Sequence, residues 1–199
     1  MKQYQDHYFK KAKRERFPAR SVYKLEEIDR RFRLLKPGQK VLDLGAAPGS
    51  WTLYAADRVG ERGRVLGLDL AAAAVALPRN AAIEQADLLG DQAGLAGLLD
   101  QLSPFDVVLS DMAPRTSGVR FADQARSLEL CERARDVAFE RLAPGGGFVA
   151  KIFEGPDAKA FVEGLRPRFA SVKVFKPKSS RSESKEIFVV GLGFRGREG

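Results

Sequence analysis

Apolar and polar positions alternate between two spacings along most of the chain. Short apolar runs of strand length recur between longer stretches whose apolar residues repeat with helical spacing. The predicted strands are residues 41–44, 64–70, 80–86, 105–110, 148–153, 171–175 and 186–192. The predicted helices are residues 19–34, 51–59, 91–102, 123–142 and 157–165. This alternation predicts an α/β domain with a Rossmann-like, mostly parallel sheet.

The last two predicted strands depart from the alternation. Only ten residues separate 175 from 186, too few for the helix of a parallel crossover. We therefore expect a seven-stranded sheet whose last strand runs antiparallel. The chain is interpreted as a single domain, 1–199. Its parts are a basic N-terminal arm (1–18), an N-terminal helix (19–35), a core (40–192) and a basic tail (193–199) expected to be disordered from Phe194 on.

The first strand leads into a turn of small residues, Gly45 to Gly49, and Ser50 is predicted to cap the helix that follows. Small residues let a ligand lie against the backbone, and a helix start offers free N–H groups. Asp69 ends the second strand about 20 residues beyond the turn, where a carboxylate reaches ribose hydroxyls. A cap for a helix over 71–76 is the alternative role for Asp69. The pattern predicts a nucleoside- or phosphate-binding corner.

A dinucleotide site is disfavoured by the same turn. Its fingerprint needs three glycines, and the corresponding positions here are Gly45, Ala47 and Ser50. Two of the three are absent, so a pyrophosphate would lose its close approach to the backbone. A nicotinamide oxidoreductase is therefore a weak hypothesis.

Several ionisable residues fall near the carboxyl ends of predicted strands, where ligands bind in open α/β sheets. Asp87 follows the third strand and Asp111 the fourth, although a loop aspartate such as Asp87 can simply be solvated. Lys151 interrupts the apolar fifth strand, which is unusual because a buried charge is costly without a partner. Lys24 borders the apolar stripe of helix 19–34, and spacing alone favours a surface lysine there.

Charge is concentrated at the two ends of the chain. Residues 1–40 carry thirteen Lys or Arg against five Asp or Glu, residues 165–199 carry nine against three, and the overall formal charge is +8. Aromatic residues lie among the cations of the arm, which is expected to be a short helix or a mobile segment. Basic ends around a nucleotide-type fold favour an RNA partner, although a solubilising tail is an equally good interpretation of the arm alone.

Cellular context can also be inferred. The chain has one cysteine, no apolar run long enough for a membrane helix and no apolar segment near the N-terminus that resembles a secretory signal. We expect a cytoplasmic protein without membrane contact, and a monomer. Cys131 is interpreted as a packing residue. Neither it nor His7 has partners at metal-ligand spacing, so no metal is expected.

The motifs DLGAAPGSW, SDMAP, PGGGFVAKIF and SSRSESKEIFVV occur in this order across the chain. From about Arg20 to Leu192 the sequence resembles the FtsJ/RrmJ-type ribosomal RNA 2′-O-ribose methyltransferases. The resemblance implies the class I S-adenosylmethionine-dependent methyltransferase fold. It also implies S-adenosyl-L-methionine as the cofactor. The implied reaction is 2′-O-methylation of the ribose of a uridine in large-subunit (23S) ribosomal RNA.

The resemblance assigns roles to individual residues. The catalytic tetrad would be Lys24, Asp111, Lys151 and Glu186. Lys151 would be the base that takes the proton of the ribose 2′-hydroxyl. The cofactor would be bound by Gly45, Gly49, Trp51, Asp69, Asp87 and Asp111.

Three alternatives stay open. The tetrad specifies the chemistry but not the RNA, so transfer RNA is a second possible substrate. The chain could also be an RNA-binding or assembly protein without catalysis. Finally, the four ionisable residues could form an ion-pair network that only holds strands together.

Overall fold

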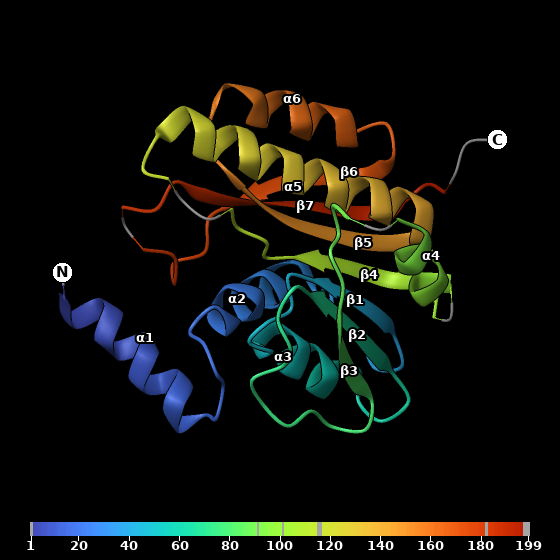
Figure 1. The fold of residues 1–199 in the computed structure, drawn as a ribbon, viewed down its shortest axis with the longest axis horizontal. Helices are drawn as coiled ribbons and strands as arrows, with labels where there is room; N and C mark the ends of the chain where they lie inside the picture. The colour runs from blue at the N-terminus through green and yellow to red at the C-terminus, as the bar shows by residue number, and fades with distance from the viewer. Residues whose placement is uncertain (1, 91, 101, 115–116, 182, 197–199) are drawn as a thin grey trace.

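One seven-stranded sheet organises the chain (Figure 1). The computed structural model describes residues 2–90, 92–100, 102–114, 117–181 and 183–196. The strands are β1 (Lys40–Leu44), β2 (Arg64–Asp69), β3 (Ala81–Gln85), β4 (Phe105–Ser110), β5 (Leu142–Phe153), β6 (Phe169–Phe175) and β7 (Glu186–Phe194). Their order across the sheet is β3-β2-β1-β4-β5-β7-β6. The predicted strands are all present, with ends that differ by a few residues.

Strand direction agrees with the prediction for the last strand. β1 to β5 pair in parallel, whereas β7 is antiparallel to both β5 and β6. β7 therefore lies between its two sequence predecessors rather than at the edge. Its first residue, Glu186, pairs with Phe153 at the end of β5. The start of β7 consequently lies at the edge where the parallel strands finish.

Helices cover both faces of the sheet. They are α1 (Lys2–Arg14), α2 (Val22–Phe32), α3 (Ser50–Val59), α4 (Gln92–Asp100), α5 (Arg120–Arg141) and α6 (Pro156–Leu165). Apolar residues of α2 and α3 form one core with alternate residues of β1, β2, β4, β5 and β7. Those of α4, α5 and α6 form the larger core on the opposite face. Figure 1 shows the two helix layers on either side of the sheet.

The basic arm is helical and docked rather than free. The Tyr8 and Tyr23 rings lie 5.3 Å apart, and Ala12 is buried between α1 and α2. Lys11 Nζ lies 4.2 Å from the centre of the Tyr23 ring. Of the two expectations for the arm, the structure therefore has the short helix. No helix among the described residues is both long enough and apolar enough to cross a membrane.

Two loop predictions need correction. The loop expected over residues 113–122 ends earlier, because α5 begins at Arg120; residues 115–116 lie outside the described part of the chain. The expected disordered tail is wrong at its first residue, since Phe194 is the last residue of β7 and 2% exposed. Its ring stacks on Phe139 at 5.9 Å and 17° and lies 5.4 Å from that of Phe169.

The aromatic cluster around Phe194 generates a stability prediction. Phe194→Ala is expected to lower the free energy of unfolding by about 3–5 kcal/mol, because it leaves a cavity between β7 and α5. Phe194→Leu keeps most of the apolar volume and should cost clearly less. Urea denaturation followed by circular dichroism measures both. Equal stability of Phe194→Ala and the wild type would contradict the packing described here.

Candidate functional site

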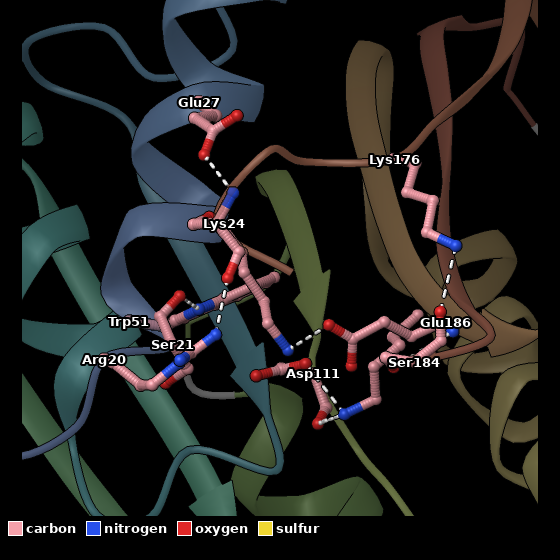
Figure 2. A network of polar contacts seen from close by, with 11 residues as sticks. Arg20, Ser21, Lys24, Glu27, Trp51, Asp111, Lys176, Ser184 and Glu186 are labelled. Carbon is pink, nitrogen blue, oxygen red and sulfur yellow. Dashed lines mark hydrogen bonds and ion pairs between the residues drawn. The ribbon is translucent and has the colours of Figure 1, made fainter. Parts of the chain in front are cut away.

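The carboxyl edge of the sheet gathers four ionisable side chains from four elements. Asp111 follows β4, Lys151 lies in β5 opposite Phe188 of β7, and Glu186 opens β7. Lys24 comes from the first turn of α2, which covers this end of the sheet. Residues separated by up to 162 positions in the sequence thus converge (Figure 2).

Lys151 is buried, and its ammonium forms an ion pair and hydrogen bonds with Asp111. Its Nζ lies 2.8 Å from Asp111 Oδ1 and donates a second hydrogen bond to the Asp111 carbonyl oxygen at 2.7 Å. Lys151 is 6% exposed. A buried ammonium is costly unless it is paired and hydrogen-bonded, and Asp111 supplies both. Lys151 therefore reaches from β5 to Asp111 at the end of the neighbouring strand β4.

Lys24 forms the second ion pair. Its Nζ lies 2.6 Å from Glu186 Oε1, and the two side chains are 13% and 11% exposed. The prediction from spacing that Lys24 is a surface lysine is therefore wrong. The Lys24 ammonium also lies 5.8 Å from the centre of the Phe188 ring.

Glu186 links the two ion pairs electrostatically. Burial raises the pKa of its carboxyl, but the charge of Lys24, the hydrogen bond from Lys24 and the charge of Lys151 outweigh burial. The net effect holds the pKa of Glu186 below its usual range. Glu186 is therefore a carboxylate that interacts with both lysines, so the four groups act as one network.

The loop between β6 and β7 is held in place by α2. The two carboxylate oxygens of Glu27 accept hydrogen bonds from the backbone N–H groups of Lys178, at 2.7 Å, and Ser179, at 2.8 Å. Arg20 donates to the Ser179 carbonyl oxygen at 2.7 Å. Sequence reasoning missed this clamp; the one available signal was the position of Glu27, three residues after Lys24. The clamp fixes the loop that carries Ser180 to Glu186.

A cavity of about 370 Å³ opens beside Asp111 at the ends of β1, β2, β3 and β4. Its polar lining includes Asp69, Asp87 and Asp111, and its apolar lining includes Leu70, Leu89 and Met112 among others. Gly45 also lines it with a φ of +78°, and a Cβ there would lie 2.7 Å from Met112 Cγ. Four of the six predicted cofactor residues, Gly45, Asp69, Asp87 and Asp111, thus surround one space.

Gly49 and Trp51 do not line this cavity. Trp51 is 3% exposed and donates from Nε1 to the Ser21 carbonyl oxygen at 2.9 Å. Its ring lies 5.9 Å from that of Phe188, in the core beneath α2. Gly49 has a φ of +113°, and a Cβ there would lie 2.9 Å from Val75 Cγ2. Gly49 therefore permits close packing of the loop after β2, and Trp51 fastens α2 to α3.

The local roles predicted for Ser50 and Asp69 are corrected. Ser50 is the first residue of α3, and its hydroxyl accepts from Ala19 N at 2.8 Å instead of capping the helix. Residues 71–76 are not helical, so Asp69 caps no helix there. Its carboxylate accepts from Ala47 N at 3.0 Å and Ala71 N at 2.9 Å. Asp69 thus ties the glycine turn to the loop after β2.

A second cavity, of about 360 Å³, lies on the other side of the tetrad. Its lining includes the cations Arg20, Lys24 and Arg181, the carboxylates Glu183 and Glu186, and Ser184. The two ion pairs therefore stand between two cavities. One has acidic and apolar walls. The other has three cations against two carboxylates and is called the basic cavity below. Such a pair of cavities can present a cationic donor and a polyanionic acceptor to the same four side chains.

Comparison with known proteins adds to this geometry. The profile of the FtsJ-like methyltransferases matches residues 17–194. The chain belongs to this family. It is 59% identical over 198 residues to "Ribosomal RNA large subunit methyltransferase E" of Nitratidesulfovibrio vulgaris (strain DP4), covering 100% of this chain and 97% of the relative. A protein of the same name from Bdellovibrio bacteriovorus is 53% identical over 190 residues, or 94% and 95% of the two chains.

A similar fold is also found by structural comparison. A crystal structure from Plasmodium falciparum, titled as a ribosomal RNA methyltransferase, superposes with a TM-score of 0.79 and 27% identity. The match covers 91% of this chain and all of that one. The expected class I methyltransferase fold, with its antiparallel β7, is thereby confirmed.

FtsJ-family methyltransferases use S-adenosylmethionine, and the acidic cavity fits this cofactor. Its volume falls in the range of small-molecule sites. Asp69 and Asp87 offer acceptors for hydroxyl and amino groups, and Leu70 and Leu89 expose apolar surface for a flat base. Asp111 brings negative charge where a sulfonium would lie. When bound, the cofactor supplies an electrophilic methyl group.

Asp43 is a buried carboxyl beneath the cofactor turn. Burial raises the pKa of Asp43 to about 7; a hydrogen bond from Thr52 opposes this, and the nearby charges of Asp111 and Asp69 add to it. Thr52 Oγ1 donates to Oδ2 at 2.7 Å, while Oδ1 has no hydrogen-bond partner among the described residues. The folded protein therefore favours a protonated Asp43 below neutral pH.

This shift predicts a pH dependence of stability. An unfolded aspartate ionises near pH 3.8, so the wild type should lose stability as pH rises from about 4 to about 7. The Asp43 carboxyl accounts for at most about 4 kcal/mol of this loss, since one pKa unit corresponds to about 1.4 kcal/mol. Asp43→Asn should remove this contribution, so that the free energy of unfolding depends less on pH. Urea titrations between pH 4 and 8 measure the slope. Exposed Asp57→Asn is the matched control, and an unchanged slope in Asp43→Asn would contradict the prediction.

Proposed function

We propose that this chain transfers the methyl group of S-adenosylmethionine to a ribose 2′-hydroxyl of large-subunit ribosomal RNA, at a uridine. The observation that carries the proposal is the Lys24, Asp111, Lys151 and Glu186 network standing between an acidic cavity and a basic one. Relatives that align over the whole chain carry the name of a large-subunit ribosomal RNA methyltransferase, which supports this RNA as the substrate.

Each member of the network has a role in the proposed reaction. Lys151 Nζ, after losing one ammonium proton to solvent, would accept the 2′-hydroxyl proton as a neutral amine, and Asp111 holds Nζ in position through two contacts. Lys24 and Glu186, which line the basic cavity, would orient the ribose by hydrogen bonds. Asp111 also lines the acidic cavity, so it would align Lys151, the proposed base, with the methyl donor. Holding hydroxyl and methyl in line supplies much of the rate, because it removes the entropy of bringing them together.

The choice of RNA is tested by incubation with labelled methyl donor. Large-subunit ribosomal RNA, intact large subunits and transfer RNA are offered separately, and the labelled nucleotide is mapped. Label on a ribose of ribosomal RNA, free or in subunits, is the expected result. Label on transfer RNA alone would favour the second substrate, and no label on any RNA would favour a binding protein without catalysis.

Lys151→Ala is expected to lower kcat by at least about 100-fold, the usual contribution of a general base. Lys151→Arg should be similarly inactive, because a guanidinium keeps the charge but cannot act as a base. Calorimetry should find S-adenosylmethionine affinity retained in Lys151→Arg.

Exposed Lys173→Ala, on the far strand β6, is the control for the Lys151 variants and should retain full activity. The arginine variant separates the base from a purely structural ion pair. If Lys151→Arg were as active as the wild type, Lys151 would serve only to pair with Asp111.

The exposed cations of the arm should bind RNA phosphates. Lys13 and Arg14 lie in the last turn of α1, and the Arg14 side chain is 77% exposed although it lies 3.8 Å from Glu15. Lys11 is more enclosed, because it contacts Tyr23 and two glutamates. Lys13→Gln with Arg14→Gln should reduce the slope of log affinity against log salt by about 1.5, since each lost phosphate contact removes about 0.7–0.9.

The matched control for the arm is Lys173→Gln, which removes a similar exposed charge from β6. Filter binding of ribosomal RNA at several salt concentrations gives both slopes. A double variant with the wild-type slope would leave the arm with only the solubilising role.

A further inference from the structure

A third depression continues the basic cavity along the sheet edge. It has a volume of about 170 Å³. Its lining includes the cations Arg120 and Lys185, the carboxylates Asp123 and Glu154, and Phe153 and Ser184. Ser184 lines both this depression and the basic cavity that holds Lys24 and Glu186. A chain of nucleotides whose ribose meets the tetrad would therefore pass over this depression.

An exposed aromatic side chain follows Arg120, one of the residues that line this depression. Phe121 is 75% exposed and Val119 is 61% exposed, on either side of Arg120 at the start of α5. Nothing in the core of the domain requires an apolar ring here, because α5 packs through other residues such as Cys131 and Ala134. Exposed ring, adjacent guanidinium and nearby ammonium form the combination that binds single-stranded nucleic acid.

The start of α5 is held rigidly, as a binding platform needs to be. Asp123 accepts hydrogen bonds from Ser117 N at 2.7 Å and from the Ser117 hydroxyl at 2.8 Å. Ser127 Oγ accepts from Phe153 N at 3.1 Å, which joins α5 to the end of β5. Glu154 N donates to the Lys185 carbonyl oxygen at 2.8 Å, which joins β5 to the loop before β7.

We propose that Phe121, Arg120 and Lys185 bind the nucleotide next to the methylated one, with its base stacked on the Phe121 ring and its phosphate between the two cations. This rests on the proposed function, because the neighbouring nucleotide exists only if the tetrad receives RNA. The site requires a single-stranded or opened segment, since a base paired in a helix could not reach the ring.

A protein partner is the less favoured occupant of this surface. The exposed apolar area is limited to Phe121 and Val119, which lie on either side of Arg120. Stable protein interfaces need a larger contiguous patch. Continuity with the basic cavity through Ser184 also points to one elongated polyanion.

The test is steady-state methylation of the RNA substrate that the wild type accepts. Phe121→Ala should raise KM for RNA by about 5- to 50-fold with little change in kcat, as expected for loss of one stacked base. Phe121→Trp, which keeps a stacking ring, should restore a KM near that of the wild type. Arg120→Gln should raise KM and weaken its salt dependence. Affinity for S-adenosylmethionine should not change in any variant.

Val174→Ala, which removes exposed apolar surface from β6, is the control and should leave KM unchanged. An unchanged KM in Phe121→Ala, with an active wild type, would overturn this inference and leave the proposed function intact. A Phe121→Trp enzyme as impaired as Phe121→Ala would likewise overturn the stacking role. A wild type that methylates no RNA would contradict the proposed function itself, so the two failures are distinguishable.

Discussion

The reversed direction of β7 is the constraint on which the site depends. The six strands other than β7 run in one direction, so only their carboxyl ends lie at the ligand-binding edge, and each is followed by a loop or helix there. Because β7 runs the other way, its first residue lies at that edge and can carry a rigid side chain on the strand itself. Glu186 is this residue, next to the end of β5. The antiparallel insertion thus places an acid where it can meet lysines from β5 and α2.

The network needs external support because its members are costly to bury. Removing one partner of a buried ion pair costs several kcal/mol, since the other charge is left without compensation. α2 provides the support: Lys24 pairs with Glu186, while Glu27 on the same helix binds two N–H groups of the loop that leads into β7. One helix therefore fixes both the cation and the segment that carries its partner. The tetrad is positioned from outside the sheet as much as by it.

The sequence predicted those features that depend on local pattern. Strand positions, the reversed last strand and the small-residue turn all follow from spacing and loop length, and the family motifs pointed to Lys24 and Glu186. The clamp of Glu27 on residues 178–179 depends on packing between segments 151 positions apart, and no local pattern encodes it. The resemblance assigned Trp51 to the cofactor, whereas the structure shows its buried indole packed under α2, a contact that also depends on packing between separate segments.

The cofactor turn has a second role that explains its unusual composition. Its glycine side, with Gly45 and Asp69, faces the cavity beside Asp111. Its other side holds the segment before α2, because Ser50 bonds to Ala19 and Trp51 bonds to the Ser21 carbonyl. A glycine at position 50 would lose the hydroxyl that makes the first of these contacts. The motif that organises the sheet therefore also fixes the helix that carries Lys24, so the donor side and the acceptor side of the site share one rigid support.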